Sequence, residues 1–251
     1  MTLIRYPNGV EGGHFYEKNC PSHRPEWMRT ASVWAGDRAG TIDFCLVEDL
    51  PSLVWLAQLA ALELHPSLSL AADIDTPTVL ALDLDPGPPA TIVECCRVAL
   101  LLRDLFAGYG LECFPKSSGS KGMQVYVPLN GAATYETTKP YAQTLAQALE
   151  RAEPDLIVSR MTKSLRTGKV FVDWSQNTAS KTTVAVYSLR ARELPTASTP
   201  LSWDEVSDAL DAGDPDCLRF EAEEVLARVT EHGDLFAPVL DLEQELPEVA
   251  A

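Results

Sequence analysis

A short apolar run that ends in two aspartates constrains this chain more than any other stretch. The apolar residues 79–82 lead into Asp83-Leu84-Asp85, and a Pro-Gly turn signal follows. Such a bounded run is typical of a buried strand. Side chains alternate along a strand, so Asp83 and Asp85 are predicted on one face with Cα atoms about 6.5–7 Å apart. Two carboxylates at a strand end suit Mg²⁺ or Mn²⁺; the alternative is a solvated strand end before an acidic turn.

The composition indicates a globular protein with an uneven charge distribution. The chain has 251 residues, 46% of them hydrophobic, and no apolar stretch of the roughly 18 residues that a membrane span needs. The net charge of −16 argues against a nucleic-acid partner, but residues 201–251 hold fifteen Asp and Glu against two Arg. Residues 1–200 are therefore close to neutral, and the net charge decides nothing about such a partner.

The cysteines predict a reducing environment. None of the six follows a C-x-x-C pattern, and two are adjacent inside an apolar helical pattern. Buried, reduced thiols in a cytosolic protein are the expectation. The six are Cys20, Cys45, Cys95, Cys96, Cys113 and Cys217.

Helices and strands are mixed without strict alternation, which favours an α+β fold over a doubly wound parallel sheet. The patterns predict strands at 31–36, 41–47, 78–85, 111–115, 123–128, 155–159, 169–174 and 181–188, and helices at 49–64, 91–106, 135–152, 202–212 and 219–231. We expect one domain of two packed lobes over residues 1–235, followed by a loosely held acidic tail, residues 236–251.

A third aspartate strengthens the metal hypothesis. Asp173 follows the apolar run 170–172, as Asp83 and Asp85 follow theirs. Three carboxylates around two divalent ions, about 3.5–4 Å apart, are the core of two-metal phosphoryl transfer. Taken alone, Asp173 would be only an acid at a strand edge.

Several cations and a flexible turn could hold phosphates. Residues 117–122 contain two glycines, whose backbone N–H groups can converge on an anion, and Lys121 adds a positive charge. A plain hairpin turn is the alternative. Lys181 and Arg190 frame the predicted strand 181–188, so at least one is expected to reach the same cleft.

Two further groups have weaker signals. His65 closes the predicted helix 49–64, where a structural histidine is the simpler interpretation. Phe15 and Tyr16 lie beside Lys18; these aromatics could stack on bases while the cation holds a phosphate, or they could be buried.

These motifs belong to an ordered series that runs through most of the chain. In order, the blocks are Arg5-Tyr6-Pro7-Asn8-Gly9-Val10, Phe15-Tyr16-Glu17-Lys18-Asn19, Glu63-Leu64-His65-Pro66, Asp83-Leu84-Asp85-Pro86-Gly87, Ser118-Gly119-Ser120-Lys121-Gly122, Arg166-Thr167-Gly168, Asn177-Thr178-Ala179-Ser180-Lys181-Thr182, Tyr187-Ser188-Leu189-Arg190-Ala191-Arg192 and Pro200-Leu201-Ser202-Trp203. Together they resemble the polymerase domain of bacterial ligase D, a branch of the archaeo-eukaryotic primase superfamily. Stand-alone relatives, including those linked to ligase C, are equally similar. The resemblance covers about residues 3–235.

The resemblance implies an RRM-like antiparallel catalytic sheet flanked by helices, with a smaller α/β lobe. It also implies a Mn²⁺- or Mg²⁺-dependent nucleotidyltransferase that uses two ions and extends a DNA primer in non-homologous end joining or gap filling, with ribonucleotides preferred over dNTPs. Expected partners are DNA, an ATP-dependent DNA ligase and an end-binding protein, in the cytoplasm at the nucleoid and without a membrane. The implied roles are metal ligands for Asp83, Asp85 and Asp173, nucleotide contacts for His65, Ser118, Lys121, Gln124, Arg166, Lys181 and Arg190, and nucleic-acid contacts for Phe15, Tyr16 and Lys18.

The chain departs from the family pattern in two places. The phosphate-loop motif of relatives usually ends in histidine, whereas Gln124 stands here; glutamine can donate a hydrogen bond but cannot carry a positive charge. Relatives usually carry a segment before the Arg-Tyr-Pro-Asn-Gly block that binds a DNA 5′-phosphate, and this sequence starts almost at that block. We therefore expect weaker recognition of a downstream 5′-phosphate.

Two alternatives remain open. One is a nucleic-acid-binding module with weak or no catalysis. The other is a phosphohydrolase of the haloacid dehalogenase type, which also uses a strand ending in D-x-D with the first aspartate as nucleophile. Threonine or valine normally follows the second aspartate in that group, and Pro86 does not fit.

Overall fold

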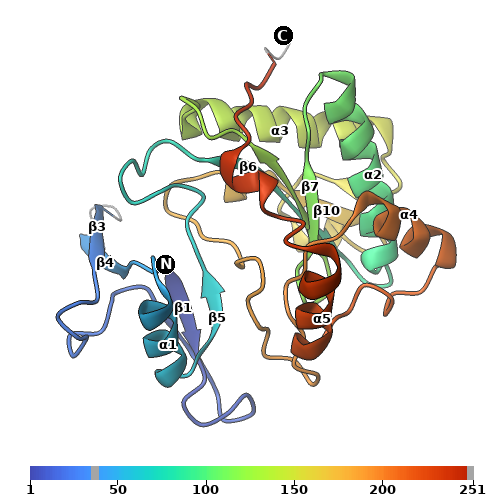
Figure 1. Cartoon of the computed structure of the whole chain (residues 1–251). Helices are drawn as coiled ribbons and strands as arrows, with labels where there is room; N and C mark the ends of the chain where they lie inside the picture. The colour runs from blue at the N-terminus through green and yellow to red at the C-terminus, as the bar shows by residue number, and fades with distance from the viewer. Residues whose placement is uncertain (35–39, 248–251) are drawn as a thin grey trace.

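A five-stranded sheet forms the centre of the larger lobe (Figure 1). The computed structural model describes residues 1–34 and 40–247. The order of the strands across the sheet is β7 (Phe114–Ser117), β8 (Met123–Pro128), β6 (Val79–Pro86), β10 (Val170–Asp173) and β9 (Ile157–Val158). Neighbouring strands are antiparallel except β9 and β10, which run parallel. The predicted α+β class is confirmed, and the expected antiparallel sheet gains one parallel edge strand.

One face of this sheet is apolar and packs against helices. The side chains of Leu80, Leu82 and Leu84 alternate along β6 and are fully buried in the main core. The helices of this core include α2 (Ile92–Gly108), α3 (Tyr135–Ala152) and α4 (Trp203–Ala212). Helix α5 (Ala222–His232) contacts α4 through an ion pair between Arg228 and Glu205. A capping box between Thr91 and Glu94 fixes the start of α2.

The opposite face of the sheet carries the polar residues. The residues that alternate with the core positions of these strands point to this face. It is apolar at one end, where Tyr126 packs against Phe236 and Val239, and polar at the other. Short 3₁₀ helices, η1 (Lys163–Leu165) and η2 (Trp174–Gln176), flank β10. Alternation along four strands thus separates a dry core from a polar face.

The smaller lobe is built from the first 65 residues. Its three-stranded sheet has the order β2 (Phe15–Glu17), β1 (Thr2–Arg5) and β5 (Ala61–His65), and α1 (Leu50–Gln58) packs against it. A separate hairpin, β3 (Thr30–Trp34) and β4 (Thr41–Cys45), lies at its side. The core of this lobe contains Leu3, Met28 and Leu56.

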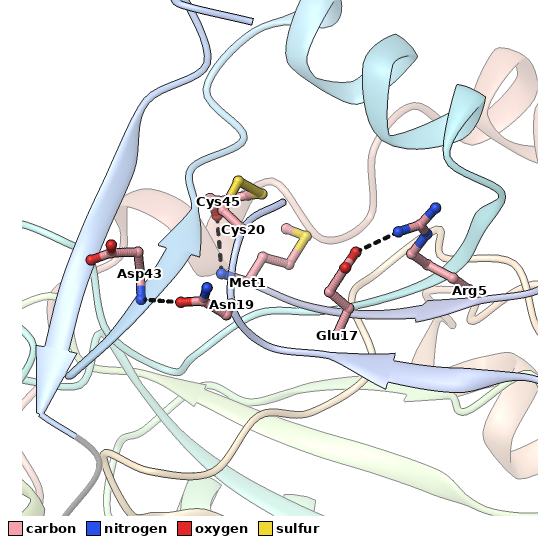
Figure 2. Close-up of a disulfide and its surroundings, with 7 residues drawn as sticks. All are labelled: Met1, Arg5, Glu17, Asn19, Cys20, Asp43 and Cys45. Atoms are coloured by element: carbon pink, nitrogen blue, oxygen red, sulfur yellow. Dashed lines mark hydrogen bonds and ion pairs between the residues drawn. A yellow bond between two sulfur atoms is a disulfide. The ribbon is translucent and has the colours of Figure 1, made fainter. Parts of the chain in front are cut away.

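The expectation of reduced thiols is wrong for two cysteines. Cys20 and Cys45 form a disulfide with Cα atoms 5.0 Å apart (Figure 2). The Cys20 amide donates to the Asp43 carbonyl at 2.6 Å, and the Asp43 amide donates to the Asn19 side chain at 3.0 Å. These bonds hold the loop after β2 beside β4, a non-local contact that cysteine spacing could not reveal. The other four are free: Cys95, Cys96 and Cys113 are buried as expected, and Cys217 is exposed.

The predicted helix 49–64 is wrong in its second half. Asp49 caps α1 as expected, but the helix ends at Gln58 and Ala60 takes a positive φ of 56°. Residues 61–65 then form β5, because they pair with β1. His65 therefore closes a strand and not a helix.

Several other segments differ from the sequence expectations. Strand β7 covers residues 114–117 and not 111–115, β9 is shorter than the predicted strand 155–159, and α5 begins at Ala222 and not at position 219. Residues 181–188 form no strand and contain a turn, in which Tyr187 has a φ of 64°. Positions 35 and 36 of the predicted strand 31–36 lie outside the described residues. The segment after residue 235 is better held than expected: α6 (Pro238–Asp241) buries Val239, and the Asn130 side chain donates to the carbonyls of Val239 and Leu242. Within the described ranges, no helix is long and apolar enough to cross a membrane.

Candidate active site

Four polar residues form one row across the open face of the sheet. Lys116 on β7 lies opposite Gln124 on β8, Gln124 lies opposite Asp83 on β6, and Asp83 lies opposite Asp173 on β10. Directly opposite residues of antiparallel strands have Cα atoms about 4.5–5.5 Å apart. Four segments far apart in the sequence thus bring a lysine, an amide and two carboxylates into line.

An open cleft of about 470 Å³ lies over this row. It collects most of the residues that the sequence singled out, including both aspartates of the β6 strand, which share a face as predicted. The lining residues from that set are His65, Asp83, Asp85, Ser118, Lys121, Gln124 and Arg190. Six other predicted residues lie outside the lining: Phe15, Tyr16, Lys18, Arg166, Asp173 and Lys181.

The carboxylates of the cleft repel one another. Burial, followed by the nearby charge of Asp85 and that of Asp173, raises the pKa of Asp83 well above its usual range, and a hydrogen bond from Gln124 opposes the shift. Desolvation and the charge of Asp173 raise the pKa of Asp85, and Arg166 lowers it. This concentration of negative charge favours a cation at the same place.

Asp173 lies near that pair but is engaged elsewhere. One carboxylate oxygen accepts hydrogen bonds from the Ser175 amide at 2.9 Å and the Ser175 hydroxyl at 2.5 Å, and the other accepts from the Gln176 side chain at 3.0 Å. Asp173 therefore caps η2. Across residues 1–34 and 40–247, no three His, Cys, Asp or Glu side chains are grouped closely enough to hold a metal ion.

The glycine-rich turn lies directly against the strand of the two aspartates. A Cβ atom added at Gly122 would lie 2.1 Å from the Leu84 carbonyl oxygen, so only glycine allows this approach. The Ser118 hydroxyl accepts hydrogen bonds from the amides of Ser120 and Gly122, both at 3.3 Å. The turn is thus shaped by its own serine and leaves Lys121 exposed at the cleft.

Glu63 connects the two lobes at the edge of the cleft. Its carboxylate lies 3.0 Å from Arg190 Nε and 3.3 Å from His65 Nε2, and it accepts hydrogen bonds from the Tyr6 hydroxyl and the Ala191 amide. Burial raises the pKa of Glu63, but His65, Arg190 and the Ala191 amide outweigh it and lower the pKa to about 2. Arg190 also donates to the Ser118 carbonyl at 2.8 Å, so Glu63 fixes a cation that holds the turn.

Arg166 and Lys181 approach the site from outside the cleft lining. The Arg166 guanidinium lies over the Phe171 ring, 3.7 Å from its centroid, on the strand that carries Asp173. Lys181 donates to the Ser175 hydroxyl, which in turn bonds Asp173. The charge of Arg166 lowers the pKa of Asp85, and Lys181 is connected to Asp173 through the hydroxyl of Ser175.

The predicted nucleic-acid contacts lie on the smaller lobe. Phe15 and Tyr16 on β2 are 44% and 67% exposed, which contradicts the alternative that they are buried. The Arg5 guanidinium lies 5.1 Å from the Phe15 centroid, and Lys18 is exposed beyond the strand. As successive residues of a strand, the two rings point to opposite faces of the sheet, Phe15 beside Arg5 and Tyr16 against His14. Each exposed ring is suited to stacking on a base.

Comparison with known proteins identifies the family. The family model described as "LigD, primase-polymerase domain" matches residues 1–236. The chain belongs to the LigD primase-polymerase domain family. It is 41% identical over 241 residues to the multifunctional non-homologous end joining protein LigD of Mycolicibacterium smegmatis, covering 95% of this chain and 31% of that protein. It is 33% identical to the bifunctional LigD protein of Bacillus subtilis, over 84% of this chain and 33% of that one.

A solved structure agrees with the fold of this LigD-type domain. The polymerase domain of Mycobacterium tuberculosis ligase D, solved in complex with DNA, matches with a TM-score of 0.85 and 40% sequence identity, covering 96% of this chain and 84% of that one. The predicted primase-like architecture is thereby confirmed. The chain spans about a third of the length of the curated LigD relatives it matches.

Some residues of this LigD-type site were missed by the sequence analysis. Arg192 and Gln176 line the cleft, Glu63 holds Arg190, and Lys116 ends the polar row. Alternation along a strand would have placed Glu63 and His65 on one face, but the sequence analysis assigned these residues to a helix. Lys116 carried no signal, because a lysine beside a turn is ordinarily a surface residue.

Proposed function

We propose that this chain is a metal-dependent nucleotidyltransferase that adds nucleotides to a DNA primer strand during end joining or gap-filling repair. The observation that carries the proposal is the row in which Asp83 lies between Gln124 and Asp173, with Asp85 in the same cleft. Membership of the LigD primase-polymerase family and the DNA bound to the similar solved domain support it.

The chemistry of the carboxylates fits a hard divalent cation. Asp83 and Asp85 offer only oxygen ligands on one face, which suits Mg²⁺ or Mn²⁺, and the mutual repulsion of the acids favours such an ion. Asp173 would join them by releasing Ser175 and Gln176. Two such ions, when bound, lower the pKa of an attacking hydroxyl and offset charge on a triphosphate.

The remaining residues would bind and orient the nucleotide. Lys121 and Arg190 present cations to the phosphates, and the Ser118 hydroxyl can donate to a phosphate oxygen while it accepts from the turn. His65 lies at the mouth of the cleft with its ring held by Glu63. We extend the proposal to a preference for ribonucleotides and to a DNA ligase and an end-binding protein as partners. These parts rest on the family resemblance, and the names of the relatives support only a role in non-homologous end joining.

A second candidate is a DNA-binding module with weak catalysis. The engagement of Asp173 with η2 and the neutral side chain at Gln124 favour it. It shares the exposed aromatic rings of Phe15 and Tyr16 with the first candidate and predicts DNA binding without extension.

Primer extension on gapped duplexes separates the two candidates. The chain is incubated with labelled NTPs or dNTPs in Mg²⁺ or in Mn²⁺, and Asp83→Asn plus Asp85→Asn serves as the inactive control. We expect extension that requires a divalent ion, is greater with NTPs and falls by at least about 100-fold in the double variant. DNA binding without extension in either metal would instead establish the binding module.

A further inference from the structure

The buried side chain of Lys116 has no role in the function proposed so far. It is 1% exposed, and its Nζ donates to the Val184 carbonyl at 3.1 Å and to the Ser198 hydroxyl at 2.6 Å. Both acceptors are neutral, and Lys116 makes no ion pair with any residue in the described ranges. A buried ammonium group without an ion pair is costly, so its place in this core calls for a reason.

The position of Lys116 relates it to the cleft. It is the first residue of the row Lys116, Gln124, Asp83 and Asp173, so its Cα lies about 10 Å from that of Asp83. Its hydrogen-bond acceptor Val184 lines the cleft. The ammonium therefore lies just behind the cleft wall without contacting the space inside.

A chain of contacts leads from Lys116 to Asp83. The ammonium lies 5.6 Å from the centroid of the Tyr126 ring, and the Tyr126 hydroxyl donates to Gln124 Oε1 at 3.1 Å. This bond occupies the amide oxygen of Gln124, so only its NH₂ group remains for the neighbouring Asp83, whose pKa Gln124 lowers. Lys116 thus lies behind the neutral side chain of Gln124, on the side away from Asp83.

We propose that Lys116 is a positioning residue of the nucleotide site, a buried cation that attracts the triphosphate through the cleft wall from behind the neutral side chain of Gln124. The inference rests on the proposed nucleotide-binding function. Its charge is little screened there, because the side chain is removed from water. Burial lowers the pKa of Lys116 to about 7, and the nearby charge of Asp83 opposes this shift. The added negative charge of a triphosphate in the cleft would favour the charged ammonium further.

The test measures the affinity of a fluorescent ATP analogue in Mn²⁺, apart from catalysis. Lys116→Gln removes the charge and keeps an amide donor one atom shorter than the ammonium, and Lys116→Met is an apolar replacement of nearly the same length. For an assumed separation of about 10 Å between the ammonium and a phosphate charge, and a dielectric constant near 20, the lost attraction predicts a Kd raised about tenfold in both, with kcat changed less than KM. Lys139→Gln, on α3 and away from the cleft, removes the same charge as the matched control and should leave Kd unchanged.

A charge placed at the neighbouring position should rescue the defect. At about pH 6, Gln124→His in the Lys116→Gln background places an imidazolium on the neighbouring strand, nearer the cleft, and should recover most of the affinity. Lys116→Arg alone keeps the charge and should retain most of the wild-type affinity. Unchanged affinity in the neutral variants would overturn the inference, and so would failure of both to fold. Loss in Lys116→Arg as well, without recovery in the double variant, would show that shape matters and overturn it too. Failure of the unaltered chain to bind the analogue would refute the proposed function instead.

Discussion

Replacing Glu63 with glutamine tests how the two lobes are joined. The side chain of Glu63 is 5% exposed and that of its partner Arg190 is 14% exposed, so Glu63→Gln leaves a nearly buried guanidinium without its counter-ion. Removing one partner of a buried ion pair costs about 3–5 kcal/mol. Glutamine still accepts from the Ala191 amide and the Tyr6 hydroxyl, so we expect the lower end, about 3 kcal/mol.

The effect of Glu63→Gln should depend on pH in a defined direction. The folded pKa of Glu63 is about 2, below its ordinary value of 4.5. A lowered carboxyl pKa stabilises the fold above the unfolded value, so the contribution is complete above about pH 5 and is lost as the pH falls from 4.5 towards 2. The free energies of unfolding of wild type and variant should differ most near pH 7 and converge in acid.

Chemical denaturation at pH 7, 5, 4 and 3 measures this difference. Glu48→Gln is the matched control, because Glu48 pairs with Arg29 in an ion pair whose side chains are 51% and 72% exposed; we expect a loss below about 1 kcal/mol. A Glu63→Gln variant as stable as wild type at pH 7, or a difference at pH 3 as large as the difference at pH 7, would refute the reasoning. The loss of alignment at Arg190 should also raise KM for nucleotide.

Three further changes have distinct expected results. Gly122→Ala should displace the turn from the Leu84 carbonyl and lower primer-extension rates at least about tenfold, whereas Gly108→Ala, where an added Cβ meets nothing within 4 Å, should not; equal rates would contradict the close approach. Tyr16→Ala should leave the melting temperature unchanged and weaken DNA binding in a fluorescence titration by about 1–3 kcal/mol; an unaltered Kd would remove Tyr16 from the interface. Cys20→Ser should lower the free energy of unfolding by about 3 kcal/mol under oxidising conditions, because the disulfide closes a sequence separation of 25; identical denaturation of variant and wild type would contradict the disulfide.

Local patterns predicted the elements that build the catalytic face. Strand β8 and helix α3 begin and end at the predicted residues, and Asp83 and Asp85 share the cleft, because alternation and capping are properties of adjacent residues. The same logic failed for residues 61–65. Their apolar residues also fit a helix, and only pairing with β1 made them a strand.

What the sequence could not predict depends on contacts between distant segments. The disulfide between Cys20 and Cys45 arises from the loop beside β4, and the Glu63–Arg190 pair joins residues 127 positions apart. The family resemblance supplied the roles of the site residues, but it did not reveal that Asp173 bonds Ser175 and Gln176. Contacts between distant segments decide the disulfide and the Glu63–Arg190 pair, and no local pattern encodes them. The contacts of Asp173 are local, because it caps η2 from two and three residues away, so a polar cap there was open to prediction.

Binding of Mn²⁺ tests most directly whether the three aspartates act together. The free Mn²⁺ signal in electron paramagnetic resonance is titrated with wild type and with Asp173→Asn, each with a non-hydrolysable nucleotide. We predict about two ions bound per wild-type chain and the loss of at least one in the variant, as Asp173 leaves Ser175 and Gln176 to join Asp83 and Asp85. Equal stoichiometry and affinity in the two proteins would show that Asp173 only caps η2 and would contradict the account.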